Sequence, residues 1–191
     1  MKSLRLLLCA LPLALTGCST LSSINWSAAY PWNWFGSSLE VTEQGVGNIT
    51  AATALDQDAL QAALSSDYRL RSGMKTQNGT IVRYFEALKG DKLALVINGD
   101  KGTVNRIAVL DDAIPTASGV KVGTPFSDLY KQAFGNCASA PSDDGVAVQC
   151  KAPDSQHISY LFTGTWSGPE GLMPSDDTLK NWKVSKIIWQ Q

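Results

Sequence analysis

The chain carries few side chains of the kinds that catalysis requires. His157 is the only histidine among 191 residues, so a Ser-His-Asp hydrolase would have to use it. The nucleophile elbow G-x-S-x-G is absent, and the nearest string, Gly164 to Gly168, places its serine one position too late. His157 also begins a predicted strand. This position favours a structural histidine, exposed or hydrogen bonded, over a catalytic one.

Adjacent aspartates are the other candidates for acid-base chemistry. A glycosidase needs two carboxyl groups about 5 to 9 Å apart across a cleft. The aspartate pairs of this chain lie at strand ends, in turns or at a helix start, where aspartate ordinarily accepts local hydrogen bonds. We therefore interpret them as turn residues and expect no catalytic residues. The pairs are Asp111-Asp112, Asp143-Asp144 and Asp176-Asp177.

Metal and nucleotide cofactors are not expected. A zinc or transition-metal site needs three or four soft or imidazole ligands, which one histidine and a pair of cysteines cannot supply. EF-hand loops, phosphate-binding glycine loops and dinucleotide fingerprints are all absent from the sequence. The sequence therefore predicts no metal, no cofactor and no enzyme.

The first 18 residues have the features of a bacterial lipoprotein signal. Lys2 and Arg5 precede an apolar run from Leu6 to Leu15, which is too short to span a bilayer. Leu15-Thr16-Gly17-Cys18 then matches the box that a lipoprotein signal peptidase cuts, so residues 1–17 form the predicted signal peptide. Cys18 should become the acylated first residue of the mature chain.

The predicted anchor gives a location. Each buried methylene contributes about 0.8 kcal/mol, so a cysteine with several acyl chains holds a protein permanently. Ser19 follows Cys18, whereas inner-membrane retention in enteric bacteria uses Asp at that position. We therefore expect a lipid anchor in the outer membrane, with the protein facing the periplasm.

Charge excludes one class of partner. Removing residues 1–17 takes two of the 16 basic residues and none of the 17 acidic ones, which leaves a net charge of −3 on the mature chain. This mild acidity is unlike the basic stripe of a nucleic-acid binder. We expect no nucleic-acid partner.

The remaining cysteines, Cys137 and Cys150, would lie in an oxidising compartment. Their spacing is far from C-x-x-C, which favours a structural disulfide over a redox pair. A loop of this length gives about 3 kcal/mol of stabilisation in the chain-entropy model. The enclosed residues, 138–149, contain turn-forming Pro, Ser, Asp and Gly.

Residues 18–38 form a predicted tether that is unusually aromatic. Aromatic side chains favour a bilayer interface or a docking surface, and they also pack onto folded domains. All three interpretations remain open: packing on the domain, contact with the membrane, and contact with a partner. The aromatic residues are Trp26, Tyr30, Trp32, Trp34 and Phe35.

Two predicted helices and a set of strands make up residues 39–191. The first helix has Thr53 as its N-cap, and its apolar face runs from Leu55 to Leu64. The second has Thr124 as N-cap and Pro125 at N1, with an apolar stripe from Phe126 to Phe134. The predicted strands are Leu39 to Glu43, Asp67 to Lys75, Thr80 to Leu88, Lys92 to Ile97, Thr103 to Leu110, Val146 to Cys150, His157 to Thr163 and Lys183 to Trp189.

Short turns between the strands of residues 67–110 require antiparallel neighbours. We therefore predict one α+β domain over residues 39–191. Its antiparallel sheet carries two main helices packed on it and one disulfide, and the element order hints at two similar halves, each a helix followed by strands.

Several features form one pattern along the whole chain: the lipobox, Gly45 to Thr50, Gly119 to Gly123, the Cys137 and Cys150 pair, and Ile187 to Trp189. This pattern resembles the YfeY family of enterobacterial lipoproteins, which RpoE regulates. The resemblance implies an outer-membrane lipoprotein induced with the envelope-stress response, of uncharacterised activity.

The favoured function is a non-enzymatic binding or assembly module. It would meet outer-membrane lipid through acylated Cys18, and an envelope protein, lipid or glycan through its sheet or its aromatic tether. The alternatives are an inhibitor of a lytic enzyme, and a hydrolase of peptidoglycan or lipid that uses the paired carboxylates.

Overall fold

The structure is a computed structural model that describes residues 39–77, 79–140, 146–169 and 172–191. The predicted signal peptide, Cys18 and the five aromatic residues of the tether lie outside the described residues. The described residues belong to one compact unit. None of their helices has the length and apolar character needed to cross a membrane.

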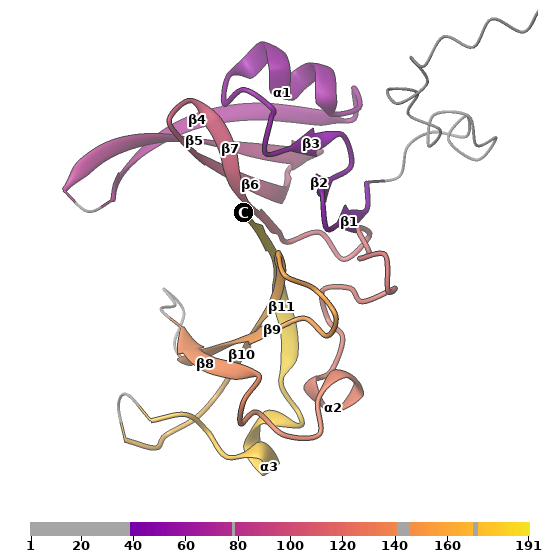
Figure 1. Ribbon diagram of the computed structural model, residues 1–191, viewed down its shortest axis with the longest axis vertical. Helices are drawn as coiled ribbons and strands as arrows, with labels where there is room; N and C mark the ends of the chain where they lie inside the picture. The colour runs from indigo at the N-terminus through magenta and orange to yellow at the C-terminus, as the bar shows by residue number, and fades with distance from the viewer. Residues whose placement is uncertain (1–38, 78, 141–145, 170–171) are drawn as a thin grey trace, which may run out of the picture. The chain divides into compact units, whose positions relative to one another are not determined.

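An antiparallel sheet dominates the described part of the chain (Figure 1). Its strand order is β4-β5-β6-β7-β11-β10-β9-β8, so two meanders of four strands run inward from opposite edges and meet where β7 pairs with β11. The antiparallel meander predicted between residues 67 and 110 is confirmed. The strands are β4 (Tyr68–Gln77), β5 (Thr80–Lys89), β6 (Lys92–Asp100), β7 (Thr103–Val109), β8 (Cys137–Ala140), β9 (Val146–Lys151), β10 (Ile158–Gly164) and β11 (Lys183–Gln190).

A second, small sheet precedes the first helix, where the sequence predicted a single strand. It has three strands of two residues each, β1 (Val41–Thr42), β2 (Gly45–Val46) and β3 (Ile49–Thr50), in that order. A Cβ atom on Gly45 would lie 1.9 Å from the backbone oxygen of Ile49, so this tight turn requires glycine. The sheet joins the rest of the unit through Val41, whose amide donates to the backbone oxygen of Pro115 at 2.8 Å.

The first helix, α1 (Gln57–Ala63), begins later than predicted. Its N-cap is Asp56, whose side chain accepts from the amide of Ala59 at 2.8 Å. Thr53 was the predicted N-cap, but its hydroxyl accepts from the amide of Thr50 at 3.0 Å and closes the preceding turn. A carboxylate at the N-cap also interacts favourably with the helix dipole.

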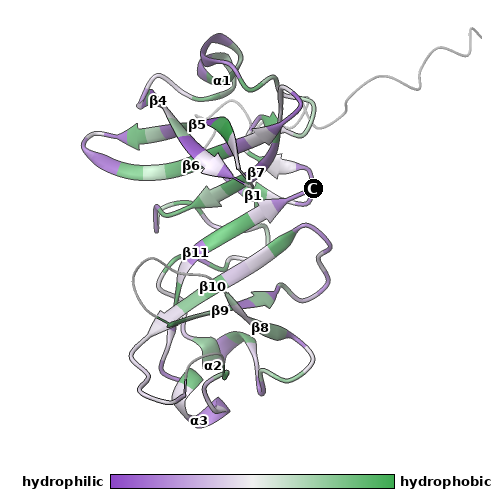
Figure 2. Cartoon of the chain, turned by 90° about the vertical axis from the view of Figure 1, so that its left-hand side faces the viewer, coloured by the Kyte–Doolittle hydropathy of each residue, from purple (hydrophilic) through white to green (hydrophobic). Residues whose placement is uncertain are grey.

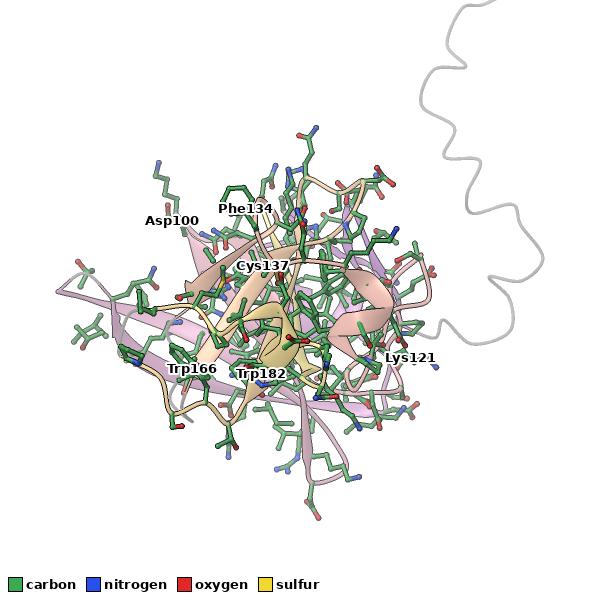
Figure 3. All side chains as sticks on the ribbon, turned by 90° about the horizontal axis from the view of Figure 1, so that it is seen from below. Asp100, Lys121, Phe134, Cys137, Trp166 and Trp182 are labelled. Atoms are coloured by element: carbon green, nitrogen blue, oxygen red, sulfur yellow. A yellow bond between two sulfur atoms is a disulfide. The ribbon has the colours of Figure 1, made fainter. Side chains whose placement is uncertain are left out.

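The second helix is much shorter than predicted. It covers only α2 (Phe126–Leu129), and Tyr130 then adopts an extended conformation with φ −135°. Two hydrogen bonds hold the backbone after Leu129 out of a helical path. The Tyr130 hydroxyl donates to the backbone oxygen of Lys151 at 2.6 Å, and the amide of Ala133 donates to Asp176 at 2.7 Å. Phe134, predicted on the apolar stripe, is 83% exposed and projects from the surface (Figure 3). Tertiary contacts override helix propensity here.

The third helix, α3 (Asp176–Leu179), lies between β10 and β11. The predicted pair of main helices is therefore wrong, because the described helices are short. The predicted α+β domain is instead a mostly antiparallel β fold with short helices and one disulfide. Its element order is a short helix and four strands in each half, with α3 inserted in the second.

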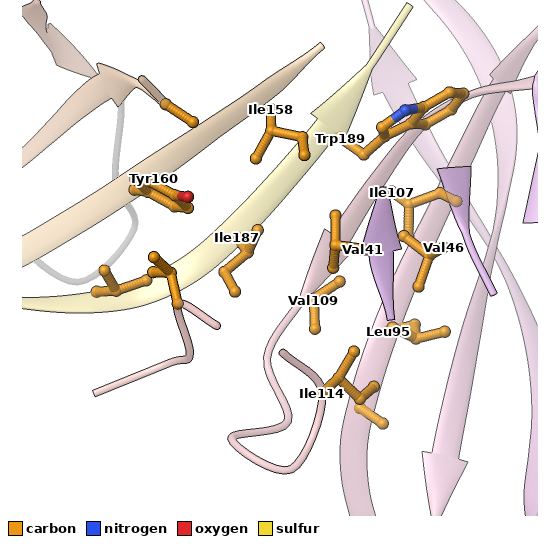
Figure 4. Packing of buried hydrophobic residues seen from close by; sticks show 14 of the residues in the cluster. Val41, Val46, Leu95, Ile107, Val109, Ile114, Ile158, Tyr160, Ile187 and Trp189 are labelled. Atoms are coloured by element: carbon orange, nitrogen blue, oxygen red, sulfur yellow. The ribbon is translucent and has the colours of Figure 1, made fainter. Parts of the chain in front are cut away.

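One face of the large sheet forms the core. Alternate residues of adjacent strands meet across both meanders: Ile107 of β7 opposes Ile97 on one side and Trp189 of β11 on the other, and Trp189 opposes Ile158 of β10. All four side chains are buried, and Figure 4 shows Ile107, Trp189 and Ile158. The core thus passes through the β7-β11 junction without interruption, and this junction fixes how the two meanders meet.

Candidate functional site

His157, the one histidine, lies in a cluster with Glu43 and Ser155. Glu43 comes from the turn between β1 and β2, and the other two come from the loop that leads into β10. The Ser155 hydroxyl donates to Oε1 of Glu43 and accepts from the amides of Ile158 at 2.8 Å and His157 at 3.3 Å. Oε2 of Glu43 accepts from the amide of Gln156 at 3.2 Å. Ser155 is therefore a turn-closing residue that ties the first hairpin to β10.

The imidazole of His157 points elsewhere. Its Nδ1 lies 3.0 Å from the backbone oxygen of Gln190, and because a carbonyl oxygen only accepts, Nδ1 carries the proton in this bond. Its ring centroid is 6.4 Å from that of Trp189. Within the described residues, no hydrogen bond joins the ring to Ser155, which is itself only 8% exposed. Ser155 and His157 are therefore not arranged as a nucleophile and its general base.

Glu43 is held as a carboxylate. The hydrogen bond from Ser155 is the main cause that lowers its pKa below 4.5, helped by the amide of Gln156 and the nearby His157 and opposed by burial. A carboxyl group with a pKa lowered by folding stabilises the fold above its unfolded pKa, and this stabilisation is lost as the pH falls through the folded value.

Glu43→Gln should therefore lower the free energy of unfolding at pH 7 by about 1.5 to 3 kcal/mol, the usual contribution of hydrogen bonds to a charged group. Urea denaturation at pH 7 and at pH 3 measures this effect. The difference from the wild-type protein should shrink at pH 3, because the stabilisation by the carboxylate decreases once the pH falls below its unfolded pKa of about 4.3. Exposed Glu40, changed to Gln, is the control. Equal stability of Glu43→Gln and wild type at pH 7 would contradict a stabilising role for the hydrogen bonds of Glu43 with Ser155 and the amide of Gln156, which we call the clasp.

The described residues of the aspartate pairs make local or structural contacts. Asp111 accepts from the amide of Ala113 at 2.9 Å, a local turn bond. Asp176 caps the backbone at Ala133, and Asp177 forms an ion pair with Lys180 at 3.0 Å. Asp143 and Asp144 lie outside the described residues. Groups of three or more metal-ligating side chains are also absent from the described ranges.

The predicted disulfide is confirmed. Cys137 and Cys150 are joined by an S–S bond of 2.05 Å and oppose each other directly in β8 and β9. The turn-forming residues 141–145 lie outside the described residues, and the strand predicted from Val146 to Cys150 is confirmed within β9, whereas β8 was not predicted. The bridge thus holds β8 at the edge of the sheet, where hydrogen bonds come from one side only.

The face of the large sheet opposite the core carries a row of polar side chains. Registers place Tyr84 of β5 opposite Asn98 of β6, Asn98 opposite Arg106 of β7, and Arg106 opposite Gln190 of β11. Lys75 of β4 lies beside this row. A cavity of about 420 Å³, which we call the Arg106 pocket, is lined by Lys75, Asn98, Arg106, Gln190 and neighbouring residues. Figure 2 shows the hydrophilic end of β11 that contributes Gln190.

Two cations share the Arg106 pocket without a carboxylate partner in the part of the chain that the structure describes. Lys75 donates to Oδ1 of Asn98 at 2.6 Å, and its ammonium lies 5.8 Å from the centroid of the Tyr84 ring. Burial lowers the pKa of Lys75, and the charge of Arg106 adds to this effect. Burial also lowers the pKa of Arg106, which is partly buried. Asp100 lines the same pocket, but it is exposed and makes no ion pair with either cation.

Sequence reasoning did not identify the Arg106 pocket. Alternation does place Asn98 and Arg106 on the face opposite buried Ile97 and Ile107, and this signal was available. The neighbour of Arg106 was not predictable, because it depends on the long-range pairing of β7 with β11.

A larger and shallower groove of about 800 Å³ lies along the edge of the second meander. Residues of β8 and β9 line it together with His157 and Gln190. Gln190 belongs to both cavities, so the polar surface continues from the Arg106 pocket toward the disulfide-bonded edge. His157 is one of the polar residues that line this groove.

Comparisons with known proteins identify similar proteins whose names state no activity. Residues 23–191 match a family described as "Protein of unknown function (DUF1131)". "Uncharacterized protein YfeY" from Escherichia coli (strain K12) is 70% identical over 191 residues, which cover all of both chains. The crystal structure of yfeY from Escherichia coli is similar with a TM-score of 0.73 and 65% identity, covering 80% of this chain and 99% of that one.

Proposed function

The chain belongs to the DUF1131 family, as its resemblance to the YfeY family predicted, and we propose that it is a non-enzymatic module that binds an anionic ligand in the Arg106 pocket. The observation that carries this proposal is the presence of Lys75 and Arg106 in one cavity without a carboxylate partner among the described residues. A phosphate or carboxylate group would neutralise the repulsion between them.

The side chains around the two cations suit an oxyanion. A guanidinium presents donors in a planar fork that matches carboxylate and phosphate geometry, while an ammonium adds a compact point charge. Asn98 and Gln190 supply amide groups beside them, and Thr80 supplies a hydroxyl. These groups both donate and accept, so they fit a ligand that carries hydroxyl groups next to its anionic group.

Binding is favoured over catalysis by what surrounds the pocket. Hydrolysis requires a general base, or a nucleophile within hydrogen-bond reach of one. The one carboxylate on the pocket lining is exposed Asp100, and His157 and Ser155 belong to the separate clasp with Glu43. The arrangement can hold a charged group but supplies no proton relay to it.

The module would be held at the outer membrane by acylated Cys18, facing the periplasm, as part of the envelope-stress response. The lipobox and Ser19 support this location, and the resemblance supports the stress response. A ligand of such a module would be a soluble or cell-wall component that diffuses past the tethered domain.

Calorimetric titration of the protein with inorganic phosphate at low ionic strength tests the proposed site. We expect binding that Arg106→Gln weakens about 10- to 100-fold, since a charge-assisted hydrogen bond contributes about 1.5 to 3 kcal/mol. Arg69→Gln is the matched control, because Arg69 is an exposed arginine of the same meander that does not line the pocket.

A titration with glucose 6-phosphate and one with glucose separate the anionic contribution from that of the hydroxyl groups. Tighter binding of the sugar phosphate than of phosphate would support a hydroxyl-bearing ligand. Equal losses of binding in Arg106→Gln and Arg69→Gln would show attraction by net charge alone and would overturn the site.

A further inference from the structure

The hairpin of β4 and β5 extends past the rest of the sheet (Figure 1). β5 pairs with β6 only from Tyr84 to Lys89, whereas it pairs with β4 along its whole length. Residues Met74–Gln77 and Thr80–Arg83 therefore form a two-stranded projection, which we call the arm. Its strands have no further strand beside them in the described part of the sheet.

One face of the arm exposes two large apolar side chains. Met74 opposes Arg83, and Thr76 opposes Ile81, so all four side chains share one face. Met74 is 69% exposed and Ile81 is 71% exposed, whereas the aliphatic residues of the central strands are buried. This face is opposite the one on which Lys75 and Val82 line the Arg106 pocket.

The hairpin that ends in the arm is electropositive in an acidic protein. Residues 68–89 contain five basic residues and one acidic residue. The acidic residue, Glu86, already accepts from Arg71 at 2.8 Å. Since the whole chain has 16 basic and 17 acidic residues, 11 basic and 16 acidic residues remain outside the hairpin. The hairpin thus has a net charge of +4 and the remainder −5.

We propose that the arm docks onto an anionic lipid surface, with Met74 and Ile81 entering the interface and Arg83 facing the phosphate groups of the lipids. Exposed apolar residues flanked by cations are the combination that binds such surfaces, because apolar burial and charge attraction add. Acidic residues are absent from the docking face, so nothing there repels the anionic lipid.

A lipid surface fits the arm better than a protein partner does. A stable protein interface buries about 1,200 to 2,000 Å² in total, which two apolar side chains on a narrow hairpin do not provide. A membrane needs no complementary shape. In the cell the docking rests on the proposed anchoring by Cys18, which would keep the arm at a high effective concentration near the bilayer.

Vesicle sedimentation tests the arm separately from the anchor. The mature chain with Cys18→Ser carries no lipid, so its binding to vesicles of phosphatidylglycerol and phosphatidylethanolamine reports only on protein contacts. We expect Met74→Ser with Ile81→Ser to reduce binding at least tenfold and Arg83→Gln to reduce it about fivefold. Vesicles of phosphatidylcholine should bind weakly, because they lack net negative charge.

Phe134→Ser is the matched control, since this exposed apolar residue lies outside the arm. As a second readout, tryptophan placed by Ile81→Trp should shift its fluorescence to the blue when anionic vesicles are added. Unchanged binding of the Met74 and Ile81 variant would overturn the proposal, as would loss of binding only when Trp32 and Trp34 are changed. Neither result affects phosphate binding or anchoring, which other residues determine.

Discussion

Cys18→Ala is expected to move the protein from the membrane fraction to the soluble periplasmic fraction. Several acyl chains on one cysteine bury many methylene groups, each contributing about 0.8 kcal/mol, and this hold disappears entirely with the sulfur atom. The arm alone would leave only weak association, because charge attraction at a lipid surface is screened within about 10 Å at 0.1 M salt. The remaining membrane-bound protein should therefore be removed by washing at high salt.

Cell fractionation with an immunoblot, together with labelling by a palmitate analogue, measures this change. Cys9→Ala is the matched control, since Cys9 lies in the apolar part of the leader and should leave both label and location unaltered. Retention of Cys18→Ala in the salt-washed membrane would refute the anchor. Ser19→Asp should in turn keep the labelled protein at the inner membrane, which tests the predicted destination independently of acylation.

The strands were predicted well where alternation was strong. In β5 buried Phe85 and Ala87 alternate with Tyr84 and Glu86, and the turns between successive strands are short, so the first meander followed from the sequence. β8 was missed because Cys137 to Ala140 are small residues without a strand pattern. The disulfide and pairing with β9, rather than propensity, hold them in place.

The second helix shows why local patterns can mislead. The spacing from Phe126 to Phe134 fits an amphipathic helix, but Tyr130 and Ala133 find partners on β9 and α3 that a continued helix would deny them. Single-sequence reasoning cannot weigh such contacts, because they depend on segments far along the chain. The same limit applies to the clasp, whose Glu43 and Ser155 are 112 residues apart.

His157 shows how much of a residue's role can be predicted from its type and position in the sequence. The sequence favoured a structural role for His157, and its hydrogen bond to the backbone of Gln190 is of that kind. The sequence did not show that Glu43 lies near His157 in the fold. The carboxylate of Glu43 is the charged group of the clasp. The Arg106 pocket was not predictable for a related reason, since its lining residues come from five strands whose order only the fold determines.

Trp189→Ala is expected to remove a large share of the stability of the fold. Trp189 is 2% exposed at the junction of the two meanders, and its indole donates to the backbone oxygen of Glu43 at 3.0 Å. Truncating a buried tryptophan costs about 3 to 5 kcal/mol, against a total of about 5 to 15 kcal/mol for a typical domain. Urea denaturation followed by circular dichroism measures the difference.

Trp189→Phe separates packing from hydrogen bonding at this position, and it should lose only part of the same free energy. Trp166→Ala is the matched control, because Trp166 is only partly buried and packs at the margin of the core. A loss below about 1 kcal/mol in Trp189→Ala, or one no larger than in Trp166→Ala, would contradict a core that is continuous through the β7-β11 junction. The junction would then be a seam between two separately stable meanders, and each would be expected to unfold in its own transition.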